Sequence, residues 1–509
     1  MSSRILLAAC LLLTVSASAG TYYVSTSGND LNQGTLDSPF KSISKATGLA
    51  LPGDTIYVRG DTFVVAVTIN ITRSGAAGNM CSLLAYPGER PLLDCSSMAL
   101  GSSNRGINLG GSYWHIKGLD IVRAGDNGMR ITGSNNAVEF CSFAGNMDTG
   151  LQLDNGASNN RIINCDSFDN SDPAQGNADG FAPKLSVGTG NYFYGCRSWQ
   201  NSDDGWDGYL RGANGVTTTL ENCWCFLNGY LSNGSPSTGN GNGFKMGGSD
   251  LKDLEHNMIL RNCLAFDNRV KGFDQNNNKG SMTLLNCTAY RNGTNYSITQ
   301  ALDSGRTLTV MNCVALGSYG FLGAFAVQAT NSWMSPFVVS TADFVSIDTA
   351  GVRAPRKPDG SLPDVPYMHL APGSDLINAG TDVGISYNGS APDLGAFETE
   401  EPVAVSTTPA AAAEFVFFQN YPNPFNPKTG IRYSVPAQSG RDGQVSGVSE
   451  VKITVYDVLG REVAVLVNEK KEAGTYEVRF DGSRLASGVY IYRLTAGSFV
   501  QSRKMLLLR

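Results

Sequence analysis

Carboxylate side chains are concentrated in two short segments of the sequence. Asp179 lies in an Asn-Ala-Asp-Gly-Phe segment, and Asp203, Asp204 and Asp207 lie in a Ser-Asp-Asp-Gly-Trp-Asp segment that follows it. Four carboxylates in one patch repel one another, and neutralising them by protonation requires large pKa shifts. A bound hard cation resolves the repulsion, and oxygen ligands beside loop glycines favour Ca²⁺ over Zn²⁺. The alternative is a set of solvated acidic turns that hold no ion.

A lone lysine follows the acidic segments. Lys245 lies between glycines in Gly-Asn-Gly-Phe-Lys-Met-Gly-Gly. A lysine in such a loop is most often a solvated surface residue, but a lysine beside a cation site is also a candidate base. The three histidines, His115, His256 and His369, are scattered and have no metal or triad spacing, so we expect them to be structural.

A repeat built on cysteine and asparagine indicates the scaffold that must position these residues. Seven segments resemble Asn-Cys-x-x-Phe-x-Asn, and their cysteines are separated by 24, 31, 27, 40, 24 and 26 residues: Cys141, Cys165, Cys196, Cys223, Cys263, Cys287 and Cys313. Coils of about two dozen residues are typical of a β-solenoid, in which neighbouring coils stack to bury a common core. Asp179 and Asp203 are 24 residues apart, so we expect them to lie one above the other on adjacent coils.

The same position in successive coils favours buried thiols stacked inside the solenoid. Disulfides are the alternative in an exported protein, with Cys223/Cys225 and Cys81/Cys95 as the pairs to consider. Lys245 follows the 40-residue interval, which carries an insertion of about 16 residues beyond the 24-residue repeat.

The composition supports a mostly β architecture. Of 509 residues, 59 are glycine and only 16% are charged, which suits short strands and tight turns. A net charge of −6 argues against nucleic acid as a partner, so an acidic ligand would need a local device such as a metal ion. Residues 1–19 have the pattern of a signal peptide, and no later stretch is apolar for the ~18 residues of a membrane helix.

The chain therefore divides into four expected parts: a signal peptide (1–19), a solenoid (20–398), a Pro-, Thr- and Ala-rich linker (399–413) and a small β-sandwich (414–509). Residues 321–397 are expected to form closing coils and loops of the solenoid. A short amphipathic helix near Ser42 is expected to cap its open end.

The three segments around Asp179, Asp203 and Lys245 resemble, in order, those of the pectate lyases of polysaccharide lyase family 9. The resemblance covers roughly residues 21–397 and implies an all-β fold, a right-handed parallel β-helix. It also implies that Asp179, Asp203, Asp204 and Asp207 bind a catalytic Ca²⁺ and that Lys245 is the base. The implied reaction is β-elimination on polygalacturonate, or pectin, giving 4,5-unsaturated oligogalacturonides.

The physical requirements of that reaction are consistent with the residues. A calcium ion neutralises the carboxylate beside the carbon that loses its proton. Lys245 must be neutral to accept this proton, so its pKa is expected to fall and activity to favour alkaline pH. Lys184, Arg269 and Lys271 are candidates for binding substrate carboxylates. Two alternatives stay open: a β-helical hydrolase of the polygalacturonase type and a noncatalytic surface protein that binds polysaccharide.

The C-terminal part resembles the sorting domains of type IX secretion cargo, with strands expected at 451–456, 463–467, 474–480 and 488–496. This resemblance implies a bacterial protein, secreted or attached to the cell surface, that engages secretion machinery at the outer membrane. An immunoglobulin-like spacer without a sorting role is the alternative. We expect a monomer.

Overall fold

The computed structural model describes residues 19–399 and 415–507, the latter without 419, 421, 422, 424, 437, 440–444, 447, 448, 473 and 498. Two compact units are found, one up to residue 400 and the other from residue 401. Residues 1–18 of the predicted signal peptide (1–19) and residues 400–413 of the predicted linker (399–413) lie outside the described residues.

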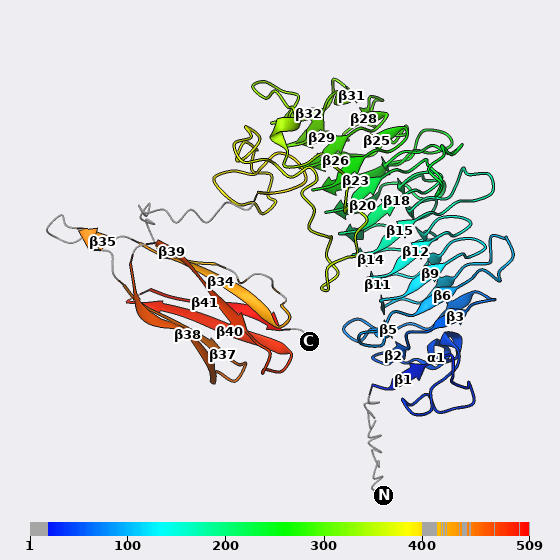
Figure 1. Cartoon of the computed structure of the whole chain (residues 1–509), viewed down its shortest axis with the longest axis horizontal. Helices are drawn as coiled ribbons and strands as arrows, with labels where there is room; N and C mark the ends of the chain where they lie inside the picture. Colours follow the sequence, from blue (N-terminus) through cyan, green and yellow to red (C-terminus); the bar gives the residue numbers. More distant parts are fainter. Residues whose placement is uncertain are drawn as a thin grey trace, which may run out of the picture. The chain divides into compact units, whose positions relative to one another are not determined.

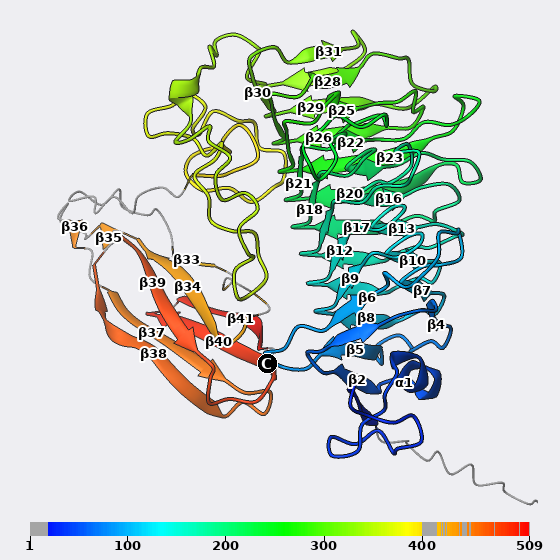
Figure 2. The same ribbon diagram turned by 45° about the vertical axis from the view of Figure 1, so that its right-hand side comes forward.

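The first unit is a solenoid of three parallel sheets, and each coil adds one strand to each sheet (Figure 1 and Figure 2). Sheet 1 contains β1 (Thr21–Val24), β2 (Thr55–Val58), β5 (Cys81–Ala85), β8 (Trp114–Lys117), β11 (Ala137–Glu139), β14 (Arg161–Ile163), β17 (Asn191–Tyr194), β20 (Val216–Glu221), β23 (His256–Arg261), β26 (Met282–Leu285), β29 (Leu308–Met311) and β32 (Val327–Ala329).

Sheet 2 contains β3 (Thr62–Val64), β6 (Leu92–Asp94), β9 (Asp120–Val122), β12 (Ser142–Ala144), β15 (Asp166–Phe168), β18 (Arg197–Trp199), β21 (Trp224–Phe226), β24 (Leu264–Phe266), β27 (Thr288–Tyr290) and β30 (Val314–Leu316). Sheet 3 contains β4 (Ile69–Ile71), β7 (Ile107–Leu109), β10 (Met129–Ile131), β13 (Leu151–Leu153), β16 (Phe181–Pro183), β19 (Trp206–Asp207), β22 (Phe244–Lys245), β25 (Lys271–Asp274), β28 (Thr294–Ile298) and β31 (Gly320–Leu322).

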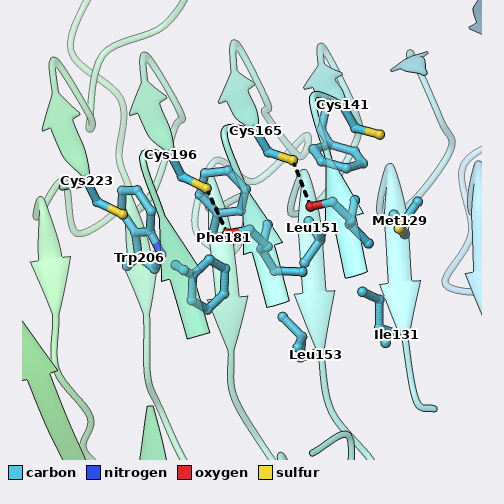
Figure 3. Packing of buried hydrophobic residues seen from close by; sticks show 14 of the residues in the cluster. Met129, Ile131, Cys141, Leu151, Leu153, Cys165, Phe181, Cys196, Trp206 and Cys223 are labelled. Atoms are coloured by element: carbon cyan, nitrogen blue, oxygen red, sulfur yellow. Dashed lines mark hydrogen bonds between the residues drawn. The ribbon is translucent and has the colours of Figure 1, made fainter. Parts of the chain in front are cut away.

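The core is a set of side-chain stacks that run from coil to coil. Successive residues of a strand point to opposite faces, so equivalent residues of paired strands meet inside the solenoid. The aromatic rings of Phe181, Trp206, Phe244 and Phe273 stack in this way, with ring centroids 4.8–5.2 Å apart. The repeated cysteines form a second stack beside them (Figure 3). All ten described cysteines are buried and unpaired, so the prediction of stacked thiols is confirmed.

An asparagine ladder joins the coils at the turn between sheet 2 and sheet 3. Asn170 donates from Nδ2 to Oδ1 of Asn201 (2.8 Å), which donates in turn to Asn228 (2.9 Å), and Asn228 donates to Asn268 (2.9 Å). These asparagines are the last residues of the repeated motif. Their side-chain amides hydrogen-bond to one another in a buried turn, where polar groups without a partner would destabilise the fold.

The N-terminal end of the solenoid is covered by α1 (Ile43–Leu49). Ser42 caps this helix by accepting a hydrogen bond from the N–H of Lys45 (3.1 Å). Ile43 and Ala46 on its inner face are buried in the core, as the predicted capping role requires. No helix among the described residues is long and apolar enough to cross a membrane.

Residues 330–399 return along the outside of sheet 2 and add no further coils, so within the expected closing coils and loops (321–397) the solenoid strands end at Ala329. The segment contains only one short 3-10 helix, η1 (Thr341–Asp343). Its apolar residues, including Tyr367 and Leu376, pack on Trp224 and Phe266 of sheet 2. Arg197 anchors it from β18 by donating to the carbonyls of Val352 and Ala354 (2.9 Å each).

The C-terminal unit consists of antiparallel strands. One sheet contains β33 (Val416–Phe417), β34 (Lys428–Val435) and β39 (Gly474–Asp481); another contains β38 (Glu462–Lys471), β37 (Ser449–Tyr456), β40 (Gly488–Ala496) and β41 (Phe499–Leu507); β35 (Gln438–Ser439) pairs with β36 (Val445–Ser446). The four strands expected from the sequence are present. The predicted fold class, a parallel β-helix followed by a small antiparallel β unit, is confirmed.

Candidate active site

Strand register brings the acidic segments together on sheet 3. Phe181 of β16 pairs with Trp206 of β19, an offset of 25 residues. Asp179 therefore lies beside Asp204, whose backbone N–H donates to Asp179 Oδ1 (3.1 Å). The expected 24-residue match of Asp179 with Asp203 is wrong by one residue, because the turns before β16 and β19 do not repeat the spacing of the cysteines.

Two glycines allow these turns to approach so closely. A Cβ added to Gly180 would lie 2.0 Å from Oγ of Ser198, and one added to Gly205 would lie 2.0 Å from Sγ of Cys225. Real Cβ atoms do not approach other atoms so closely. The glycine after Asp179 and after Asp204 is thus needed so that each aspartate turn can pack against the neighbouring strand of sheet 2.

Lys245 joins the cluster from the next coil. Asp207 pairs with Lys245 across β19 and β22, and both side chains are buried. The Nζ of Lys245 lies 2.9 Å from Oδ2 of Asp204 and 3.1 Å from Oδ1 of Asp207. Lys184 is a second buried cation, with its Nζ 2.7 Å from Oδ2 of Asp179 and 3.5 Å from Oδ2 of Asp207. Two lysines and three carboxylates thus form one network.

Burial and crowding shift the pKa values in this network. Burial raises the pKa of Asp179 and of Asp203, and neighbouring carboxylates add to the rise at both residues. Burial alone would lower the pKa of Lys245, but the carboxylates of Asp204 and Asp207 outweigh it and hold this pKa well above its usual value. The expected lowering of the Lys245 pKa depends on a cation beside these carboxylates as well as on burial, so it stays a prediction.

Three of the predicted ligands have the geometry of a metal site. Asp179, Asp203 and Asp204 are buried, and one carboxylate oxygen of each lies within 4.8 Å of the others. Oδ1 of the neighbouring Asn242 is buried without a hydrogen bond, and so is Oδ2 of Asp204, although Lys245 is close to it. An all-oxygen set with unsatisfied acceptors and strong mutual repulsion fits a hard cation such as Ca²⁺. Asp207, the fourth predicted ligand, is held instead between the two lysines.

The insertion before Lys245 covers Asp203. The N–H of Asn240 donates to Oδ1 of Asp203, and the hydroxyl of Ser237 donates to the carbonyl of Ser202. Thr238 also donates to the carbonyl of Ala174, in the loop before Asp179 (3.0 Å). The additional residues in this coil thus form a wall that holds the acidic turns in place.

An open groove of about 670 Å³ runs from this network along sheet 3 towards the N-terminal coils. Its lining includes Asp203, Asp207 and both lysines at one end, and Arg130 and Gln152 further along. The charged network therefore lies where a long ligand following the solenoid axis would contact it.

Two of the predicted substrate contacts are not part of the groove lining. Arg269 donates to the carbonyl of Gly239 and so supports the insertion, and Lys271 lies 2.8 Å from Oδ1 of Asp274. Lys184 is in the groove, but its ammonium is bound to Asp179. His256 is buried and structural, with its ring nitrogens bonded to Thr218 and Gly208.

Tyr209 is a groove residue that sequence reasoning missed. Its ring lies 5.5 Å from Nζ of Lys245, and its hydroxyl donates to Asp250 (2.6 Å). Its position two residues after Asp207 is the only signal that pointed to it. A tyrosine outside any motif cannot be assigned to the groove before the stacking of the coils is known.

These features define a class: a parallel β-helix with a surface groove that ends in buried aspartates and a lysine. The description of the matching family model is "Pel9A-like, right handed beta helix region", for residues 22–312, and a second model, "Secretion system C-terminal sorting domain", matches residues 419–508. The chain belongs to the Pel9A-like family of β-helix pectate lyases.

Individual relatives agree with this assignment. Pectate lyase L of Dickeya chrysanthemi is 40% identical over 390 residues, which cover 74% of this chain and 90% of that protein. Pectate lyase PEL9 of Emericella nidulans is 33% identical over 398 residues, covering 72% and 95%. Among solved structures, pectate lyase Pel9A has a TM-score of 0.70 at 38% identity, covering 75% of this chain and 97% of the other. A rhamnogalacturonan lyase has a TM-score of 0.62 at 29% identity, covering 70% and 98%.

Proposed function

We propose that the chain cleaves polygalacturonate by calcium-dependent β-elimination with Lys245 as the base. The observation that carries the proposal is the contact of a buried lysine with the aspartates of the adjacent coil, at the end of a groove. Membership of a pectate lyase family supports the substrate class.

The proposed role of Lys245 is to remove the C5 proton of a galacturonate unit. The C4–O4 bond then breaks as a C4=C5 double bond forms, and O4 leaves with the rest of the chain and takes a proton from water. Ca²⁺, held by Asp179, Asp203 and Asp204 with Asp207 as the fourth predicted ligand, supplies charge neutralisation at the substrate carboxylate. An ion that shared the charge of these carboxylates would weaken their effect on the pKa of Lys245, whereas burial acts to lower this pKa. The neutral amine that accepts the proton is favoured at alkaline pH.

The test follows absorbance of the unsaturated product from polygalacturonate at alkaline pH, with calcium and with a chelator. Lys245→Ala is expected to abolish the signal, and Lys279→Ala to leave it unchanged, because the ammonium of Lys279 donates to the Ala301 carbonyl at the surface and is not part of the groove lining. New reducing ends without absorbance would indicate a hydrolase. If neither absorbance nor new reducing ends appear, the remaining alternative is a protein that binds polysaccharide without cleaving it.

The rhamnogalacturonan lyase among the solved structures makes rhamnogalacturonan a second substrate to test. The higher identity to pectate lyases favours polygalacturonate. Faster cleavage of rhamnogalacturonan in the same assay would reverse the order of the two substrates without changing the proposed base.

We further propose that residues 414–509 direct export to the outer membrane and cell surface, supported by the sorting-domain match at 419–508. Removal of residues 414–509 should leave an active enzyme that accumulates in the periplasm of a host with the secretion system. Unchanged export of the shortened chain would contradict a sorting role.

A further inference from the structure

Five consecutive strands of sheet 3 place one residue each in line with Lys245. Arg130 pairs with Gln152, Gln152 with Ala182, and Asp207 with Lys245, while Ala182 adjoins Asp207 through the pairing of β16 with β19. Neighbouring strands lie about 4.8 Å apart, so the four steps from Lys245 to Arg130 span about 19 Å. Both ends of this line belong to the groove lining.

Arg130 is held so that its guanidinium remains available to a ligand. Its Nε and Nη2 lie 3.1 and 2.8 Å from the two carboxylate oxygens of Asp154, and Gln152 donates to the same carboxylate (2.8 Å). Within the described residues no hydrogen bond or ion pair involves the Nη1 group. Both residues line the groove, and the side chain of Arg130 is 25% exposed whereas that of Asp154 is only 7% exposed, so the cation is the more accessible member of the pair.

Two other arginines of the groove lining, Arg105 and Arg211, are also paired with carboxylates, at 3.0 Å from Asp126 and 3.0 Å from Asp250 respectively. Asp148 and Asp172 also line the groove, and each accepts backbone N–H bonds, from Thr149 (2.7 Å) and Ala174 (3.1 Å) respectively. What distinguishes Arg130 from the other two arginines is its position in line with Lys245 on sheet 3.

We propose that Arg130 forms a distal subsite that binds a carboxylate of an extended polyuronate chain whose reacting unit lies at Lys245. The proposal rests on the lyase function proposed above and adds a requirement for chain length. A guanidinium with a free N–H edge is suited to a carboxylate, and a chain must cross four coils to reach it. A short oligomer bound at Lys245 does not.

The test compares Arg130→Gln with Arg123→Gln, which removes an arginine paired with Asp94 (2.7 Å) outside the groove lining. For Arg130→Gln we expect about a tenfold rise in KM for polygalacturonate, because one charge-assisted hydrogen bond to the substrate is lost. We expect kcat to stay within about twofold, and the rate with trigalacturonate to be unchanged. Arg130→Lys should recover part of the affinity, and the difference from wild type should shrink at high salt.

Equal losses on polymer and trimer, or no loss on the polymer, would overturn the subsite. To separate this result from a failure of the proposed reaction, polygalacturonate binding is measured by calorimetry in Lys245→Ala, with and without Arg130→Gln. Weaker binding in the double variant supports the subsite even when no elimination is seen. Equal binding in the two chains overturns it, and thermal unfolding of each variant verifies that the fold is intact.

Discussion

Nζ of Lys245 lies 2.9 Å from Oδ2 of Asp204, a carboxylate whose other oxygen accepts two hydrogen bonds from Asn242 (2.9 Å each). The same Asp204 belongs to the three-aspartate group that fits a cation. A metal ion bound by this group would therefore compete with the lysine for one buried carboxylate. Under the proposed mechanism, metal binding and the charge of Lys245 would be coupled through this single side chain.

Replacement of Lys245 by methionine is expected to strengthen calcium binding while abolishing activity. The substitution removes a buried positive charge and leaves Asp204 Oδ2 without a competitor, so the dissociation constant should fall about tenfold or more. Titration calorimetry of Lys245→Met against wild type measures this effect, with Lys279→Met as the control. Unchanged or weaker calcium affinity would show that the lysine and the ion do not share the carboxylate.

Asp203→Asn is expected to weaken calcium binding at least about tenfold, because a charged ligand becomes a neutral one. Asp250→Asn is the matched control, because Asp250 bonds to Tyr209 and Arg211 at the surface and is not part of the three-aspartate group. The same calorimetric titration distinguishes them. Equal affinity in both variants would remove Asp203 from the ligand set.

His256 is expected to make the solenoid sensitive to acid. Burial lowers the pKa of His256 to about 4, below its ordinary value of 6.5, so protonation favours the unfolded chain. The contribution of neutral His256 to the free energy of unfolding is therefore fully present above about pH 6.5. It is lost as the pH falls to about 4, and the loss amounts to up to about 3 kcal/mol. Denaturant unfolding between pH 8 and 4 should show a smaller acid loss in His256→Gln than in wild type. An unchanged profile in His256→Gln would contradict the assignment.

Gly205→Ala is expected to destabilise the protein by about 1–3 kcal/mol, the usual cost of overpacking. The added methyl would meet Cys225 Sγ at 2.0 Å and the carbonyl of Gly243 at 2.8 Å. Cys225→Ala in the same chain should recover part of the loss. Gly48→Ala in α1, where nothing lies within 4 Å, is the control and should not destabilise. Denaturant unfolding of the four chains measures the effect, and a neutral Gly205→Ala would show that the turns are less tightly packed.

The stacked core could be predicted because each coil repeats the same residue types at the same position. Cys165, Cys196 and Cys223 all point inwards, and their spacing gave the coil length that placed the acidic segments on neighbouring coils. Register at single-residue accuracy could not be predicted, since the turns between sheets vary in length. The cysteine spacing therefore matched Asp179 with Asp203, whereas the strands place it beside Asp204.

Features that depend on distant or unpatterned contacts escaped prediction for a different reason. The return of residues 330–399 along sheet 2 relies on contacts such as that of Arg197 with Val352, 155 residues away. No periodic pattern in the sequence predicts this path. Arg130 likewise lies in no motif. Its relation to Lys245 appears only when the coils are stacked, because the two residues lie four strand steps apart in sheet 3.

The insertion at residues 229–241 leaves the pairing of the strands around it intact: Trp206 pairs with Phe244, and Phe244 with Phe273. The strands beneath this wall of the groove therefore keep their register in spite of the additional residues. Segments exchanged between relatives at this loop would leave the scaffold unchanged, provided that they keep the contacts of Ser237 and Asn240 with the acidic turns.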